Sequence, residues 1–340
     1  MQINYVYQFN FRYLPKEFIP RLCRLLGNNE IFSTSTDHEN CVKITQVMRR
    51  CVLSQKSNNL EPLFPEYIQE KPTLSYVQAT DPWIMQKFIS GVEILFGRRK
   101  IESIYDSLKE QPFDVESFFT SALQATKIDS CYDTDKLDAL PKTGPLVFVA
   151  NHPFGVVDGL VLCDLAVKAR GNFRILINAM LCRDRDLAPY FLPIDFRETK
   201  AAIKNNIRSK KMAQEALEQD IPLLVFPSGF VSTADRKGFG SVVDAPWTTF
   251  AAKLIRDTQA TVVPVYFRGQ NSRIFHLASH VAEPLRMALL LNEASNRFGT
   301  KVMAEIGDPL PWTDLNDVGN RQQLTSYLYD KVQCLAQQKT

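Results

Sequence analysis

The second half of the chain alternates short apolar runs with segments of helical length, and this alternation restricts the fold more than any other feature. Six runs rich in β-branched and aromatic residues read as strands: PLVFVA, FRILIN, YFLPIDF, PLLVFP, TVVPVYF and KVMAEIG. Segments such as ETKAAIKNNIRSKKMAQEALEQD separate them. The alternation predicts an α/β fold with a central, mostly parallel sheet that carries helices on both faces.

Residues before about position 130 follow a different pattern and read mostly as helices. The stretch DPWIMQKFISGVEILFGRRK illustrates it, with apolar residues at helical spacing at Ile84, Phe88, Val92 and Leu95. We therefore divide the chain into a helical N-terminal region, residues 1–130, and an α/β domain, residues 131–340.

The segment from Trp83 to Lys100 has two interpretations. Its broad apolar face and its basic end, Arg98-Arg99-Lys100, suit a helix that lies in an anionic membrane interface. The same pattern also suits a core helix whose basic C-terminus complements the helix dipole. The sequence leaves both interpretations open.

Charge and composition disfavour several classes of protein. The 40 basic residues are nearly balanced by 37 acidic ones, so the net charge of +3 does not indicate a nucleic-acid partner. The seven cysteines are scattered without a C-x-x-C pair, which argues against a disulfide framework and fits the cytosol. His276 and His280 have metal-ligand spacing but lack a further ligand nearby, so no metal is expected. Neither a secretory signal nor a membrane-spanning run is recognisable.

The first strand-like run of the α/β region ends abruptly at Asn151-His152-Pro153. In an open α/β sheet, the carboxyl end of a strand faces the ligand crevice, so we expect Asn151 and His152 to lie at its rim. Gly155 permits a turn, and a helix beginning near Asp158 would bring that carboxylate back to the imidazole. Such a carboxylate fixes the tautomer of the ring and stabilises the imidazolium. The alternative is a helix-capping Asp beside a solvent-exposed His.

The stretch NHPFGVVDG resembles the signature of the glycerolipid (lysophospholipid) acyltransferase family, and more closely its hemolysin-like and ornithine-lipid-type branch, in which the motif reads N-H-P-x-G-x-x-D-G. Three further blocks follow in the family's order. LPIDFRETKAA resembles the second block, with Arg197 at the basic position; LVFPSGFVS resembles the third, and VVPVYFRGQNS the fourth. The blocks together cover roughly residues 140–310.

This resemblance implies lipid metabolism: transfer of an acyl group from acyl-CoA or acyl carrier protein to a lysolipid-like acceptor, without a cofactor. His152 would be the general base and Asp158 would orient it. Backbone N–H groups near Gly155 or Gly229 are expected to stabilise the oxyanion. We expect the protein in the cytosol or peripheral on the cytoplasmic face of a membrane. We expect the substrates to contact Asn151, Gly155, Arg197, Pro227, Ser228, Gly229, Phe230 and Arg236.

The third block departs from the family pattern. Ser228 stands where the common form has Glu, and Phe230 stands where the hemolysin-like form has Glu. Arg197, Arg236 and Lys237 remain for an anionic head group, although the last two also fit a solvated charged loop. We therefore expect an anionic lysolipid or acylated amino acid as acceptor, bulkier or less polar near Phe230.

Two other functions remain open on the sequence alone. One is a noncatalytic lipid-binding or acyl-carrier-binding protein that kept the fold, which the altered third block permits. The other is a thioester hydrolase of the same fold, in which water replaces the acceptor. The presence of both His152 and Asp158 favours the transferase over the noncatalytic protein.

Overall fold

A computed structural model of the chain describes residues 62–70, 72, 75, 83–95, 97–234, 240–280 and 283–337. All six predicted strands are present in it. They are β2 (Leu146–Ala150), β3 (Arg174–Asn178), β4 (Phe191–Ile194), β5 (Leu223–Val225), β6 (Thr261–Arg268) and β7 (Lys301–Ile306). A further short strand, β1 (Asp129–Cys131), was not predicted.

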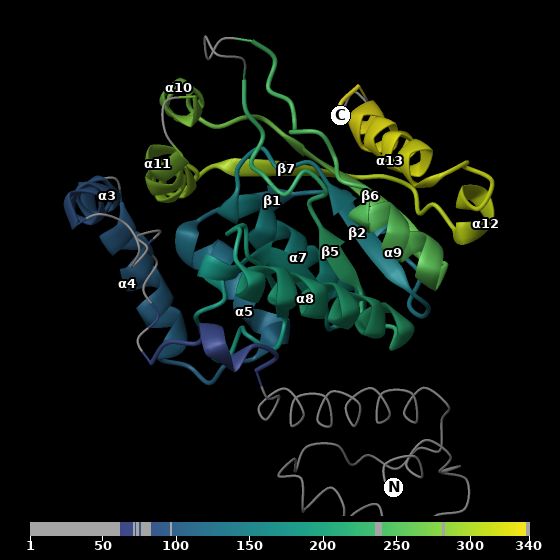
Figure 1. Cartoon of the computed structure of the whole chain (residues 1–340), viewed down its shortest axis with the longest axis horizontal. Coiled ribbons are helices and arrows are strands. Elements are labelled where there is room, and N and C mark those ends of the chain that lie inside the picture. The colour runs from purple at the N-terminus through teal and green to yellow at the C-terminus, as the bar shows by residue number, and fades with distance from the viewer. Residues whose placement is uncertain are drawn as a thin grey trace, which may run out of the picture. The chain divides into compact units, whose positions relative to one another are not determined.

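These strands form one sheet in the order β1-β7-β6-β2-β5-β3-β4 (Figure 1). Five neighbouring strands, from β6 to β4, run parallel to one another. Strand β7 runs antiparallel to β6, and β1 pairs parallel to β7. The predicted α/β fold with a mostly parallel sheet is therefore confirmed.

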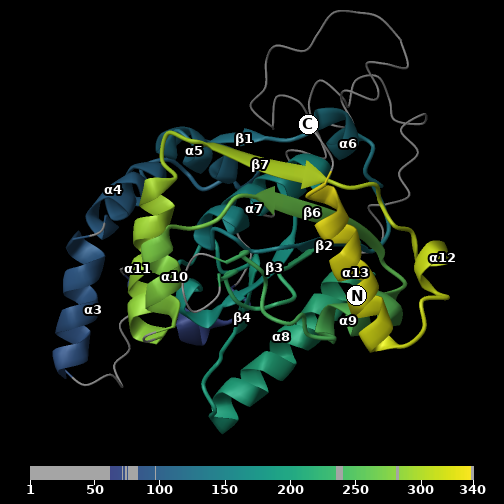
Figure 2. The same ribbon diagram turned by 90° about the horizontal axis from the view of Figure 1, so that it is seen from above.

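Helices cover both faces of the sheet (Figures 1 and 2). Strand β2 is completely buried, and its side chains alternate between two apolar clusters. Leu146, Phe148 and Ala150 face α5 (Val115–Thr126) and α7 (Val156–Arg170). Val147 and Val149 face α8 (Lys200–Glu218), α9 (Phe250–Thr258) and α13 (Arg321–Leu335). Burial on both faces explains why this strand reads as a continuous apolar run.

Four helices form the side of the molecule next to α7, and Figure 2 shows α3, α11 and α10 beside one another. They are α3 (Trp83–Leu95), α4 (Arg98–Lys109), α10 (Arg273–Ser279) and α11 (Glu283–Asn296). The shorter helices are η3 (Pro65–Tyr67), α6 (Thr134–Asp138), η4 (Ala179–Leu181) and α12 (Trp312–Leu315). Among the described residues, no helix has the length and apolarity to cross a membrane. The division of the chain at residue 130 stays a prediction.

The segment from Trp83 to Lys100 is two helices rather than the single helix that we expected. Gly97, with φ of 105°, separates α3 from α4, so the three basic residues begin α4 instead of ending α3. The helix-dipole explanation of their charge is therefore wrong. Arg98 instead contacts the buried Glu93 at 3.2 Å and Glu102 at 2.8 Å. The side chains of Phe88, Val92 and Leu95 lie outside the described residues.

Candidate active site

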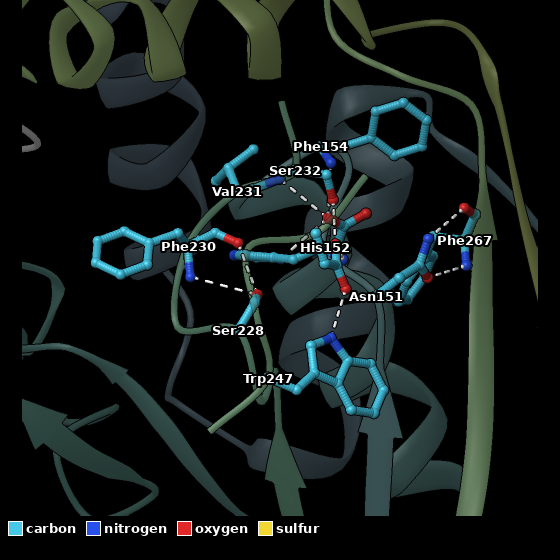
Figure 3. A network of polar contacts seen from close by, with 12 residues as sticks. Asn151, His152, Phe154, Ser228, Phe230, Val231, Ser232, Trp247 and Phe267 are labelled. Carbon is cyan, nitrogen blue, oxygen red and sulfur yellow. Dashed lines mark hydrogen bonds and ion pairs between the residues drawn. The ribbon is translucent and has the colours of Figure 1, made fainter. Parts of the chain in front are cut away.

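The candidate site lies where β2 ends, and its first residue ties that end to the neighbouring strand. The Asn151 side chain is buried, and its Nδ2 donates to the backbone oxygen of Phe267 at 3.0 Å. The Phe267 N–H donates in return to Oδ1 at 2.7 Å (Figure 3). Because both amide atoms are used in this pair, Asn151 continues the β2–β6 ladder by one residue and holds the loop that follows.

Asp158 lies in the first turn of α7 and faces back toward that loop. The helix begins at Val156, two residues earlier than we expected. The fully buried Asp158 accepts, at Oδ2, the N–H of Phe154 at 2.7 Å and of Gly155 at 3.0 Å. Asp158 therefore does cap the helix, as the alternative interpretation of the His–Asp spacing proposed.

The same carboxylate oxygen also meets the imidazole. Nδ1 of His152 lies 3.1 Å from Oδ2 of Asp158, a distance that fits an ion pair, whereas the angle departs from that of a hydrogen bond. Burial raises the pKa of the Asp158 carboxyl, and the imidazole and the two N–H donors oppose that rise. Asp158 thus caps α7 and contacts the His152 imidazole at the same time. The other ring nitrogen, Nε2, remains for a substrate.

The imidazole is also held from the side by an aromatic ring. Phe226 follows β5 directly and stacks on His152, with ring centroids 4.0 Å apart and an interplanar angle of 24°. Only 17% of the His152 side chain is exposed. Contact between the ring and solvent is therefore limited.

The third sequence block forms a tight turn beside this ring. Ser228 is buried, donates from Oγ to the backbone oxygen of Phe230 at 2.9 Å, and accepts the Phe230 N–H at 3.4 Å. The Pro227 carbonyl accepts the N–H of Thr248 at 3.0 Å. Ser228 and Pro227 therefore shape the turn.

Phe230 points outward from that turn and is 45% exposed. Its ring lies 5.2 Å from the ring of Phe196, which follows β4 and is 47% exposed. The third block thus offers an aromatic surface at the position where the hemolysin-like motif that it resembles has Glu.

Of the backbone N–H groups expected near the oxyanion, those of Gly155 and Gly229 themselves have acceptors within the protein. The Gly155 N–H donates to Asp158, and the Gly229 N–H donates to the Phe226 carbonyl at 2.9 Å. Neither group is a free donor in this structure.

Of the basic residues expected to contact the substrates, Arg197 lies within the described part of the chain. Arg197 forms a bidentate contact with Asp195, with Nε–Oδ1 at 2.9 Å and Nη2–Oδ2 at 2.5 Å. This guanidinium lowers the pKa of the Asp195 carboxyl, so much of the Arg197 charge is balanced. Arg236 and Lys237 lie outside the described residues.

His276 and His280, the pair with metal-ligand spacing, both contact the backbone of Ala234. Nδ1 of His276 accepts the N–H of Ala234 at 3.3 Å, and Nε2 of His280 lies 2.9 Å from the oxygen of the same residue. Within the described residues, no cluster of His, Cys, Asp and Glu could hold a metal ion. The pair fixes the chain after the third block.

Sequence reasoning missed three residues of the site. Phe226 and Phe196 lie at the carboxyl ends of the predicted runs PLLVFP and YFLPIDF, so their place at the carboxyl edge of the sheet was a usable signal. Asp244 accepts the His152 backbone N–H at 3.3 Å. It lies in an irregular segment without a motif, and nothing in the sequence marks it.

Comparison with known proteins places these observations in a family. Residues 92–338 match the profile of a family described as acyltransferase. Two proteins named lyso-glycine lipid O-acyltransferase, from Phocaeicola vulgatus and Bacteroides thetaiotaomicron, are 31% identical over 217 residues and 30% identical over 213. Each alignment covers 60% of this chain, with 73% and 75% of the respective relative. A crystal structure of the 1-acyl-sn-glycerophosphate (LPA) acyltransferase from Thermotoga maritima has 17% identity and a TM-score of 0.43, covering 75% of this chain and 88% of that one.

Gly155 gives a direct test of how the loop is built. Its φ of 73° and ψ of −116° suit glycine, and an added Cβ would lie 3.2 Å from Cγ2 of Val231 and 3.3 Å from Cδ2 of Leu290. Gly155→Ala should therefore lower the free energy of unfolding by about 1–3 kcal/mol, measured by urea denaturation. The control Gly159→Ala, within α7 and without a neighbour inside 4 Å, should raise it by about 0.5–1 kcal/mol. Equal stability of the two variants would contradict the strained conformation at Gly155.

Proposed function

The chain belongs to the acyltransferase family, and we propose that this lipid acyltransferase uses His152 as the general base that activates a hydroxyl group of its acceptor. The observation that carries the proposal is the 3.1 Å contact between His152 Nδ1 and the fully buried Asp158. That contact leaves Nε2 for the substrate and supplies a negative charge behind the imidazolium that forms.

The proposed reaction needs no covalent enzyme intermediate. The acceptor oxygen attacks the carbonyl carbon of a thioester of coenzyme A or acyl carrier protein, while Nε2 of His152 takes the hydroxyl proton. Asp158 stabilises the resulting imidazolium. The tetrahedral intermediate then breaks its carbon–sulfur bond, the thiolate leaves, and the imidazolium returns the proton to sulfur. An ester and a free thiol are the products, and the imidazole is neutral again.

Removal of the base should abolish most of the activity without unfolding the protein. His152→Ala should lower kcat by about 10²–10⁴-fold because proton transfer is lost. Asp158→Asn keeps an oxygen for the capping N–H groups and should still lower kcat severely. The assay follows labelled acyl groups into lipid by mass spectrometry. Asp308→Asn, which removes an exposed carboxylate paired with Lys136, is the matched control.

The outcomes of this assay separate the alternatives. Acylated lipid that forms at the wild-type rate with His152→Ala would refute the general base. Free fatty acid released at the same rate with and without acceptor lipid would identify a thioester hydrolase. Binding of the thioester without any turnover, in the presence of a total lipid extract, would identify a noncatalytic carrier-binding protein.

The aromatic surface at Phe230 supports a proposal about the acceptor. We propose an anionic lysolipid built on an amino acid, in line with the lyso-glycine lipid named for the two relatives. The third block has no acid that would attract a cationic head group. Arg286 adds a positive charge nearby, with Cζ 5.9 Å from the Phe230 ring centroid and Nη2 donating to the Val231 oxygen at 2.7 Å.

Competition between acceptors tests this proposal. At equal concentrations, lyso-glycine lipid should be acylated faster than lyso-ornithine lipid, and lysophosphatidic acid serves as the anionic comparison. Phe230→Glu should reverse the order of the two amino-acid lipids, because it places a carboxylate beside the head group. Phe230→Leu, which stays apolar, should keep the wild-type order. A wild-type preference for lyso-ornithine lipid, or an unchanged order with Phe230→Glu, would refute the proposed role of this block.

We also propose that the protein takes its acceptor from the cytoplasmic face of a membrane. At the start of α3, Trp83 is 72% exposed and Ile84 is 65% exposed, and Arg99 is an exposed basic residue of α4. Such a mixture suits an anionic lipid interface.

The four cysteines within the described residues are free, as expected in a reducing compartment: Cys131, Cys163, Cys182 and Cys334.

Vesicle binding should depend on these exposed residues and on salt. A basic residue near an anionic surface contributes about 1 kcal/mol, so Arg99→Glu should weaken sedimentation with phosphatidylglycerol vesicles by at least about fivefold at low salt. Trp83→Ala together with Ile84→Ala should weaken it at all salt concentrations. Lys211→Glu, an exposed charge reversal on α8, is the control. Unchanged binding of both α3 and α4 variants would favour the core-helix interpretation.

A further inference from the structure

Asp244 joins three separate donors around the backbone of His152. Its Oδ1 accepts the His152 N–H at 3.3 Å and the hydroxyl of Ser232. Its Oδ2 accepts the indole N–H of Trp247 at 2.9 Å. Asp244 is partly buried and Trp247 is buried, so much of this cluster is shielded from solvent.

The residues that bind His152 in this cluster come from one segment, residues 226–249, which joins β5 to α9 and of which residues 226–234 and 240–249 are described. The Ser232 N–H donates to the His152 carbonyl at 2.8 Å. Thr233 and Val243 close the segment on itself, because each donates its N–H to the oxygen of the other at 3.1 Å. The backbone N–H and C=O of His152 are thus bound by the same segment.

The same segment also supplies the ring contact. Phe226, at its start, stacks on the imidazole at a centroid distance of 4.0 Å. The place of His152 is therefore set by three contacts with this segment and by the carboxylate of Asp158. Strand β2 delivers His152 to the rim, and segment 226–249 fixes where its ring lies.

We propose that Asp244 is a positioning residue for His152. Its carboxylate holds the His152 peptide so that Nδ1 stays beside Asp158 and Nε2 meets the acceptor. An ionised carboxylate only accepts hydrogen bonds and has room for several donors, which matches the three donors and no acceptor that contact it in the described part of the chain. This inference rests on the proposed function of His152 and adds a residue that does not touch the substrate.

An amide of the same shape cannot replace this carboxylate. In Asp244→Asn, the Nδ2 group would face either the Trp247 indole N–H or the two donors at Oδ1, so that two donors meet in every orientation. Displacement of a catalytic group by about 1 Å costs on the order of 10²-fold in rate. Asp244→Asn should therefore lower kcat by about 10- to 100-fold, while KM for the thioester changes by less than about threefold.

Two further variants remove one donor each and leave the carboxylate in place. Ser232→Ala and Trp247→Phe should each lower kcat less than Asp244→Asn does. They keep the test open if Asp244→Asn fails to fold, which thermal unfolding would reveal. Asp308→Asn is again the matched control and should keep the wild-type kcat.

Amide hydrogen exchange separates this inference from the proposed function. In the free protein, the His152 N–H should exchange faster in Asp244→Asn, while N–H groups in the centre of α7 keep their protection. Faster exchange with an inactive wild type would support the positioning role and refute the acyl transfer. Folded Asp244→Asn with wild-type kcat and wild-type exchange at His152 would overturn the inference. So would a rise in KM without a change in kcat.

Discussion

A carboxylate that has no exposed surface must be stabilised within the protein, and Asp158 imposes this constraint on everything around it. One of its oxygens receives two backbone N–H groups and lies beside the His152 imidazole. The loop after β2 must therefore turn sharply at Gly155 to present those N–H groups. The start of α7 and the bend of the loop follow from placing one acid in the interior, and the same acid is one of the contacts that orient the imidazole.

Much of the fold could be predicted from the sequence because the central strands are buried on both faces. Leu146–Ala150 carries an apolar residue at every position, and such a run stands out between helical segments. The edge strand β1 was not predicted because Asp129-Ser130-Cys131 is short and only partly buried. The break at Gly97 was not predicted because helical spacing continues across it, and spacing does not reveal the glycine's φ of 105°.

The site could be predicted in part, for reasons that differ from residue to residue. His152 and Asp158 are close in sequence, so a single turn brings them together. The third block was identified, but its interior contacts were not, because the use of Ser228 inside its own turn depends on backbone angles. Asp244 could not be predicted, because its partner His152 lies 92 positions away and no motif surrounds it. Long-range contacts of this kind follow from the assembled sheet.

These contacts join residues that are far apart in the sequence, and this separation affects how the chain folds during its synthesis. Asn151 is bound by a residue 116 positions later, and His152 by one 92 positions later. On the ribosome, the motif therefore emerges long before the strand and the segment that order it. His152 therefore belongs to an unfinished chain until β6 has been synthesised, and nonlocal strand pairing of this kind is slow. A nascent chain therefore exposes the motif NHPFGVVDG before the contacts that order it can form.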